Sequence, residues 1–102
     1  MNQTILITGA TDGIGKLVAE KLAHDNFEII LHGRNEDKLK AVVEQIQKHT
    51  GNQKIHTTLS DFADLSSVKT MAEKLNQDFS NIDIIINNAG IFKSKIDKSQ
   101  DE

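Results

Sequence analysis

The 102-residue chain has no cysteine, proline, tyrosine or tryptophan. Without cysteine it can form neither disulfides nor thiolate sites, so cysteine usage does not restrict its redox compartment. The net charge of -3 and the scattered basic residues give no electrostatic reason to expect a nucleic acid or a membrane surface as a partner. The length is enough for one small domain with a single core.

Signals for metal binding and for membranes are also missing. The four histidines lie far apart and lack the spacing of metal ligands, so each is expected at the surface or at a strand end. The N-terminal residues include neither a basic segment nor a long apolar one, and apolar runs extend over only a few residues. These features predict no signal peptide and no membrane span, and most simply a cytoplasmic protein.

Apolar runs alternate with helical periodicities and predict the order β-α-β-α-β-α-β. The expected strands are 4–8, 27–32, 54–60 and 82–87, and the expected helices are 13–24, 36–49 and 65–79. This alternation predicts a parallel sheet with right-handed crossovers, and a doubly wound sheet would have the strand order 3-2-1-4. The fold class is therefore α/β, an incomplete Rossmann-like sheet, with helices one and two on one face and helix three on the other.

Two segments differ in composition. Residues 1–92 carry the alternating pattern and are expected to form a dinucleotide-binding domain, whereas 93–102 are polar and resemble a tail or an unfinished loop. Helical spacing also predicts which apolar residues of the first and third helices face the core. These are Ile14, Leu17, Val18 and Leu22, and Leu65, Val68, Met71, Ala72 and Leu75.

A glycine-rich stretch, Thr8-Gly9-Ala10-Thr11-Asp12-Gly13-Ile14-Gly15, joins the first strand to the first helix. Glycine permits close backbone approaches, and the N–H groups and positive dipole end of the helix suit a pyrophosphate. A turn that caps the helix through Thr11 or Asp12 and binds nothing would give the same pattern. The switch point of the sheet places this stretch beside Asn88-Ala89-Gly90, where ligands bind in open α/β sheets.

The spacing T-G-x-x-x-G-I-G resembles the opening motif of the short-chain dehydrogenase/reductase family. After the fourth predicted strand, Asn87-Asn88-Ala89-Gly90 resembles the N-N-A-G box of the same family. The resemblance covers only the N-terminal part of that family. It implies hydride transfer between a nicotinamide cofactor and a carbonyl or alcohol. The cofactor contacts that it implies are Gly9, Thr11, Asp12, Gly13, Ile14, Gly15, Asn88, Ala89 and Gly90.

Arg34 follows the second predicted strand. In dinucleotide-binding folds an acidic residue here holds the ribose 2′-hydroxyl, whereas an arginine accommodates a 2′-phosphate. No carboxylate stands at that strand end, and a planar guanidinium suits phosphate. The sequence therefore favours NADP over NAD, the alternative being that Arg34 is a solvated residue at a helix start.

Asp61 and Phe62 follow the third predicted strand. The family resemblance implies that Asp61 accepts a hydrogen bond from the adenine amine and that Phe62 lines the ring. In the alternative interpretation, Asp61 caps a turn and Phe62 packs in the core. Both interpretations remain open on the sequence.

No catalytic residue is predicted in this chain. The catalytic serine of the family, its Tyr-x-x-x-Lys pair and the helix with its catalytic asparagine lie downstream of the N-N-A-G box, and this chain ends at Glu102. The family's proton donor is a phenol whose pKa is lowered from about 10 by a neighbouring lysine. We therefore expect the dinucleotide-binding part of an NADP-dependent oxidoreductase that is not catalytic alone. The alternatives are a non-catalytic nucleotide-binding module and a truncated remnant.

The substrate is not predicted, because substrate-binding segments are missing; a carbonyl or alcohol substrate is expected only if the C-terminal half is present. Asn87 is expected to brace the sheet. The fourth strand would form an edge with four isoleucines, and a helix on one face cannot bury all of them. A flat apolar edge strand pairs with other chains, so self-association through this strand is expected.

Overall fold

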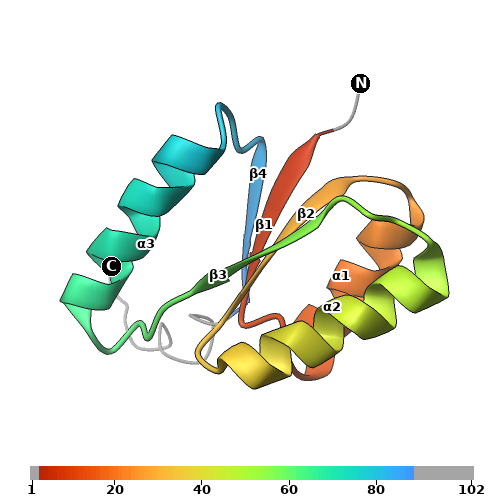
Figure 1. The fold of residues 1–102 in the computed structure, drawn as a ribbon, viewed down its shortest axis with the longest axis horizontal. Coiled ribbons are helices and arrows are strands. Elements are labelled where there is room, and N and C mark those ends of the chain that lie inside the picture. Colours follow the sequence, from red (N-terminus) through yellow and green to blue (C-terminus); the bar gives the residue numbers. More distant parts are fainter. Residues whose placement is uncertain (1–2, 89–102) are drawn as a thin grey trace, which may run out of the picture.

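A computed structural model describes residues 3–88. Four parallel strands form one sheet in the order β3-β2-β1-β4 (Figure 1). The helices α1 and α2 lie on one face of the sheet and α3 lies on the other (Figure 1). This is the predicted Rossmann-like arrangement, so the carboxyl ends of β1 and β4 are neighbours at the switch point.

The elements agree with the predicted ones to within one residue, except at the start of the fourth strand. Their bounds are β1 (Thr4–Thr8), α1 (Gly13–His24), β2 (Glu28–Gly33), α2 (Glu36–Thr50), β3 (Ile55–Leu59), α3 (Leu65–Asp78) and β4 (Ile84–Asn87). The fourth strand was predicted from residue 82 but begins at Ile84. Just before it, Asp83 bonds to Thr4 through both its side chain and its backbone: its carboxylate accepts the Thr4 N–H at 2.8 Å, and its N–H donates to the Thr4 carbonyl oxygen at 2.9 Å.

Successive side chains of a strand point to opposite faces of the sheet. In the two central strands, β1 and β2, the side chains on both faces are buried because helices cover both faces. Ile5 and Ile7 of β1 face α1 and α2, whereas Leu6 faces α3. The prediction that Ile14 and Leu17 face the core is wrong, since they are 71% and 67% exposed. Small residues make the buried face of α1 instead, and they let the helix lie close to the sheet: Gly15, Ala19 and Ala23.

The predicted core face of α3 is also wrong in part. Met71 and Leu75 are buried, and they pack on Leu6 and Ile30 of the sheet. Val68 is half-buried, whereas Ala72 is exposed and Leu65 is 83% exposed. Only two apolar sheet residues, Leu6 and Ile30, belong to the buried cluster on this face, so the apolar core beneath α3 is too small to cover a full helical stripe.

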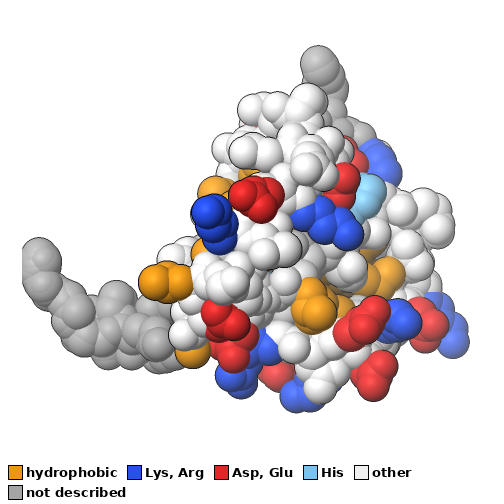
Figure 2. Space-filling model, turned by 60° about the vertical axis from the view of Figure 1, so that its left-hand side comes forward, with side chains coloured by type: hydrophobic (Ala, Val, Ile, Leu, Met, Phe, Trp, Pro, Cys, Tyr) orange, Lys and Arg blue, Asp and Glu red, His pale blue; other side chains and the backbone are white. Residues whose placement is uncertain are grey.

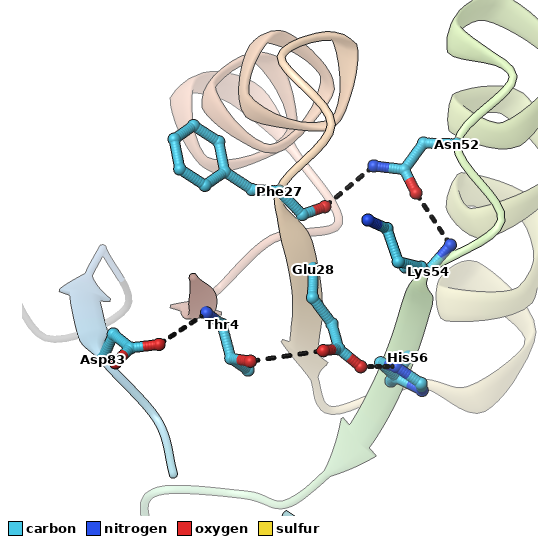
Figure 3. A network of polar contacts seen from close by, with 7 residues as sticks. All are labelled: Thr4, Phe27, Glu28, Asn52, Lys54, His56 and Asp83. Carbon is cyan, nitrogen blue, oxygen red and sulfur yellow. Dashed lines mark hydrogen bonds and ion pairs between the residues drawn. The ribbon is translucent and has the colours of Figure 1, made fainter. Parts of the chain in front are cut away.

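A polar network joins the segments at the end of the sheet opposite the glycine-rich turn (Figure 3). Buried Asn52 donates from Nδ2 to the carbonyls of Ala23 and Phe27, at 3.0 and 2.8 Å, and accepts the Lys54 N–H at 2.7 Å. Beside it, the Glu28 carboxylate contacts His56 Nε2 at 2.7 Å. Asn52 thus ties the end of α1 to the starts of β2 and β3.

Candidate functional site: the glycine-rich turn

The turn between β1 and α1 depends on glycine for two different reasons. Gly9 and Gly13 have positive φ angles of 61° and 56°, which glycine adopts without steric cost. Gly15 has no room for a side chain, since an ideal Cβ there would lie 2.4 Å from the Gly9 carbonyl oxygen and 2.7 Å from Asn88 Nδ2. The first turn of α1 therefore lies directly against the backbone of the turn.

Asn88 brings the end of β4 to the same place. Its Nδ2 donates to the Gly9 carbonyl oxygen at 3.1 Å. The two sequence motifs, which are far apart in the chain, thus meet at the carboxyl ends of β1 and β4, as the strand order predicts. Ala89 and Gly90 lie outside the described residues.

The start of α1 differs from the starts of the other two helices. Asn35 caps α2 by accepting the Lys38 N–H, and Asp64 caps α3 by accepting from Ser66 and Ser67. Asp12 stands at the N-cap of α1 with an extended backbone, but its side chain forms no capping hydrogen bond. The carboxylate of Asp12 instead lies 3.6 Å from Lys38 Nζ. Within residues 3–88, the first N–H groups of α1 therefore have no side-chain acceptor, and the positive end of the helix faces outward.

Arg34 follows β2 directly and has an exposed side chain. It forms no ion pair with any residue in the described part of the chain. The preceding Gly33 lies against the turn, since an ideal Cβ there would be 2.9 Å from Thr11 Cγ2. Arg34 therefore follows a residue that lies against the turn, and the ammonium group of Lys38 lies 3.6 Å from the Asp12 carboxylate of the turn.

Asp61 and Phe62 both have contacts within the chain, next to the end of β3. Asp61 Oδ1 accepts the Ala63 N–H at 2.9 Å, which caps a local turn. Phe62 is half-buried and packs against the core cluster beneath α3. Its ring also stacks on the ring of His32, with centroids 4.4 Å apart and an interplanar angle of 13°.

His32 is a residue of this site that the sequence pattern did not single out. Its ring is buried between the turn and the end of β3. Nδ1 accepts the Gly9 N–H at 3.1 Å, and Nε2 lies 3.1 Å from the Ser60 carbonyl oxygen. The prediction that each histidine lies at the surface or at a strand end is confirmed for His32, which lies near the end of β2. No local sequence signal predicts that its ring contacts Gly9.

The family model for short chain dehydrogenases matches residues 3–102. The chain belongs to the short-chain dehydrogenase/reductase family. Human polyprenol dehydrogenase is 32% identical over 100 residues, which are 98% of this chain and 30% of that protein. Among solved structures, menthone neomenthol reductase from Mentha piperita has a TM-score of 0.81 and 29% identity, covering 88% of this chain and 32% of that one.

A short chain dehydrogenase from Shigella flexneri 2a, solved as a complex with NADP, has a TM-score of 0.78 and 33% identity over 87% of this chain and 38% of that one. This chain therefore spans 30 to 38% of the length of the three proteins compared. The matched part of the short-chain dehydrogenase/reductase fold is the part that contains the glycine-rich turn.

Two grooves among the described residues of this short-chain dehydrogenase/reductase segment lie away from the turn. A groove of about 860 Å³ and a smaller one of about 310 Å³ run along β3, and neither is lined by a residue of the turn. The larger groove is lined by charged groups of both signs, and two of its residues, Glu28 and His56, already pair with one another. Viewed from the α3 side, acidic and basic side chains are interspersed with hydrophobic ones (Figure 2). We therefore assign no site to either groove and place the candidate site at the turn, where the two sequence motifs meet.

Residues 3–88 contain neither a candidate membrane span nor a candidate metal site. No helix there is long and apolar enough to cross a membrane. In the same part of the chain, no three or more His, Asp or Glu side chains are grouped so that they could hold a metal ion.

Proposed function

We propose that this chain is the dinucleotide-binding part of an NADP-dependent oxidoreductase. The observation that carries the proposal is the start of α1, which has no side-chain cap. This helix start lies close to Gly9 and Asn88 because Gly15 has no side chain to keep them apart. Backbone N–H groups at a helix start bind a diphosphate because they donate hydrogen bonds and carry the positive end of the helix dipole. The proposed diphosphate contacts are Gly9, Thr11, Asp12, Gly13, Ile14 and Gly15.

The exposed side chain of Ile14 supports this assignment. A large apolar side chain that is 71% exposed in the first turn of a helix adds nothing to the core. A bound cofactor would cover it. On the β4 side, Asn88, Ala89 and Gly90 are proposed to line the cofactor, and on the β3 side Asp61 and Phe62 are proposed to lie beside the adenine.

The choice of NADP rests on Arg34. Its exposed guanidinium follows β2 with no described ion-pair partner, where a 2′-phosphate would supply one. The related Shigella flexneri protein was solved with NADP, which supports this cofactor for the present chain. Lys38 adds a second cation, 3.6 Å from the Asp12 carboxylate of the turn.

Replacing Arg34 by glutamate tests the cofactor assignment. Titration calorimetry of the 102-residue chain should give tighter binding of NADP⁺ than of NAD⁺. Arg34→Glu is expected to weaken NADP⁺ by about 10- to 100-fold, the value of a charge-assisted hydrogen bond, and to change NAD⁺ by less than about threefold. Lys69→Glu, an equal charge change at an exposed position of α3, should leave both affinities unchanged. Equal losses for both cofactors would contradict the role of Arg34, and no heat at millimolar NADP⁺ would contradict the proposed function.

Hydride transfer to or from a carbonyl or alcohol is proposed only where the C-terminal half of the family's fold is also present. The 102 residues include no tyrosine, so the family's phenolic proton donor is not among them, and no catalytic residue is proposed here. The division into a binding domain over 1–92 and a polar tail over 93–102 stays a prediction, as does a cytoplasmic location.

We also propose that the chain associates with itself through β4. Within the described residues β4 pairs only with β1, and Ile84 and Ile85 are 40% and 62% exposed. Sedimentation velocity should therefore show association that increases with concentration, and Ile85→Lys should reduce it because a charge on an edge strand opposes pairing. Leu65→Lys, at an exposed position of α3, should not. A single sharp monomer boundary at all concentrations would contradict this proposal.

A further inference from the structure

We propose that His32 is a positioning residue for the glycine-rich turn: its neutral ring holds the Gly9 amide from one side and Ser60 from the other, and so fixes the turn in the shape that receives a dinucleotide. This inference rests on the proposed function. It assigns a role to a buried imidazole that belongs to neither sequence motif.

The hydrogen bonds define a single tautomer. The Gly9 backbone nitrogen can only donate, so Nδ1 must carry the lone pair that accepts this bond at 3.1 Å. The Ser60 carbonyl oxygen can only accept, so Nε2 must carry the proton. The Ser60 hydroxyl agrees, because it donates to Met71 Sδ at 3.3 Å and is left to accept from Nε2 at 3.0 Å. Both ring nitrogens are therefore used by the neutral ring.

The ring links three segments that the sequence separates. It comes from β2, its Nδ1 reaches the end of β1, and its Nε2 reaches the residue after β3. The stacked ring of Phe62 restricts its orientation further. The Ala10 N–H adds a backbone bond to the His32 carbonyl oxygen at 2.9 Å. Through these contacts the start of the turn is fixed to β2 by both the backbone and the side chain of one residue.

Protonation would break this arrangement. A proton on Nδ1 would face the Gly9 N–H donor, so the bond would be replaced by repulsion between two donors. Burial lowers the pKa of His32 from 6.5, and the hydrogen bond to the Ser60 backbone raises it in part. The segments that contact the ring carry charged residues close in sequence to those contacts: Asp12 in the turn, Arg34 after β2 and Asp61 after β3. All three side chains are exposed, and none hydrogen-bonds to the ring in the described structure.

The expected pH dependence follows from the direction of the shift. Because the pKa is lower in the folded chain than in the unfolded one, the stabilising bond is fully present above about pH 6.5 and is lost as the pH falls through the lower, folded-state pKa. Affinity for NADP⁺ should fall in the same range. The 2′-phosphate itself titrates near pH 6, as phosphate monoesters do, so the wild type must be compared with variants at each pH.

Two variants separate the hydrogen bonds from the shape of the ring. His32→Phe keeps a ring that can stack on Phe62 but removes the acceptor for Gly9. His32→Asn keeps an acceptor near the position of Nδ1 and does not titrate in this range. We expect His32→Phe to lose about 10-fold or more in NADP⁺ affinity at pH 8, and His32→Asn to lose less, by calorimetry. Both variants should lack the extra loss of affinity that the wild type shows on acidification.

A ligand-free measurement on the wild type keeps the test independent of variant folding. Imidazole ¹⁵N shifts should report a protonated Nε2 and an unprotonated Nδ1 at pH 8, and protection of the Gly9 amide from exchange should fall as the ring titrates. The opposite tautomer, or a Gly9 amide unaffected by ring protonation, would overturn the proposal, as would wild-type affinity and pH dependence in His32→Phe. A coupled Gly9 amide in a chain that binds no NADP⁺ would support the positioning role and refute the proposed function instead.

Discussion

Gly15→Ala is expected to weaken NADP⁺ binding by about 100-fold or more and to destabilise the fold by about 1–3 kcal/mol. The added Cβ would lie 2.4 Å from the Gly9 carbonyl oxygen and 2.7 Å from Asn88 Nδ2. Neither contact can relax cheaply, because one atom is backbone and the other belongs to an amide that already donates to that same oxygen. The helix must move away from the turn, which displaces the N–H groups proposed to bind the diphosphate.

Helix propensity alone gives the opposite expectation for stability. Alanine inside a helix is favoured over glycine by about 1 kcal/mol, so a variant that met no obstacle would be more stable than the wild type. Gly51→Ala is the matched control, since its φ is 76° and an added Cβ there meets nothing within 4 Å. It should cost about 1 kcal/mol in backbone strain and leave NADP⁺ affinity unchanged. Chemical denaturation and calorimetry measure the two effects; a more stable Gly15→Ala variant with full affinity would contradict the geometry.

Asn52→Ala is expected to destabilise the chain by about 3 kcal/mol or more, as measured by urea unfolding. The substitution removes a buried amide that satisfies three backbone groups at the junction of α1, β2 and β3. Each buried polar group left without a partner costs about 1–3 kcal/mol. The Ala23 carbonyl keeps a bond from Asn26, so the larger part of the loss should come from Phe27 and Lys54.

Asn76→Ala is the control for this prediction. It makes the same chemical change at an exposed position inside α3, where alanine has the higher helix propensity. Its effect should lie within about 0.5 kcal/mol. If Asn52→Ala were as mild as Asn76→Ala, water would be satisfying the junction and the amide would not hold these segments together.

The order of elements could be predicted because strand and helix periods alternate clearly along the chain. The strand order followed from the handedness of crossovers and from the doubly wound pattern. Side-chain direction was less predictable. Ile14 and Leu17 of α1 have the spacing of core residues but are exposed, because the buried stripe of α1 consists of small residues. Leu65 of α3 also has this spacing and is exposed. Hydrophobicity alone cannot distinguish a helix packed through alanines from one packed through leucines.

The sequence predicted the part of the candidate site in which the backbone geometry requires glycine. It did not predict the part that is formed by contacts between residues far apart in the chain. The spacing of Gly9, Gly13 and Gly15 indicated a turn with close backbone approaches, and the structure has them. His32 was not predicted as part of the site, because its role depends on a bond to Gly9 that no local pattern encodes. The ion pair between Lys38 and Asp12 was not predicted either, because it depends on how α2 packs beside α1.

An amide-resolved NMR titration of the 102-residue chain with NADP⁺ tests the central claim most directly. We predict the largest shift changes at the backbone amides of Gly9, Gly13, Ile14 and Gly15, with further changes at Arg34 and Asn88. Amides of Ile55 to Thr57, along the groove beside β3, should stay unchanged. Changes confined to that groove, or none at all at millimolar NADP⁺, would contradict the claim that the turn binds the diphosphate.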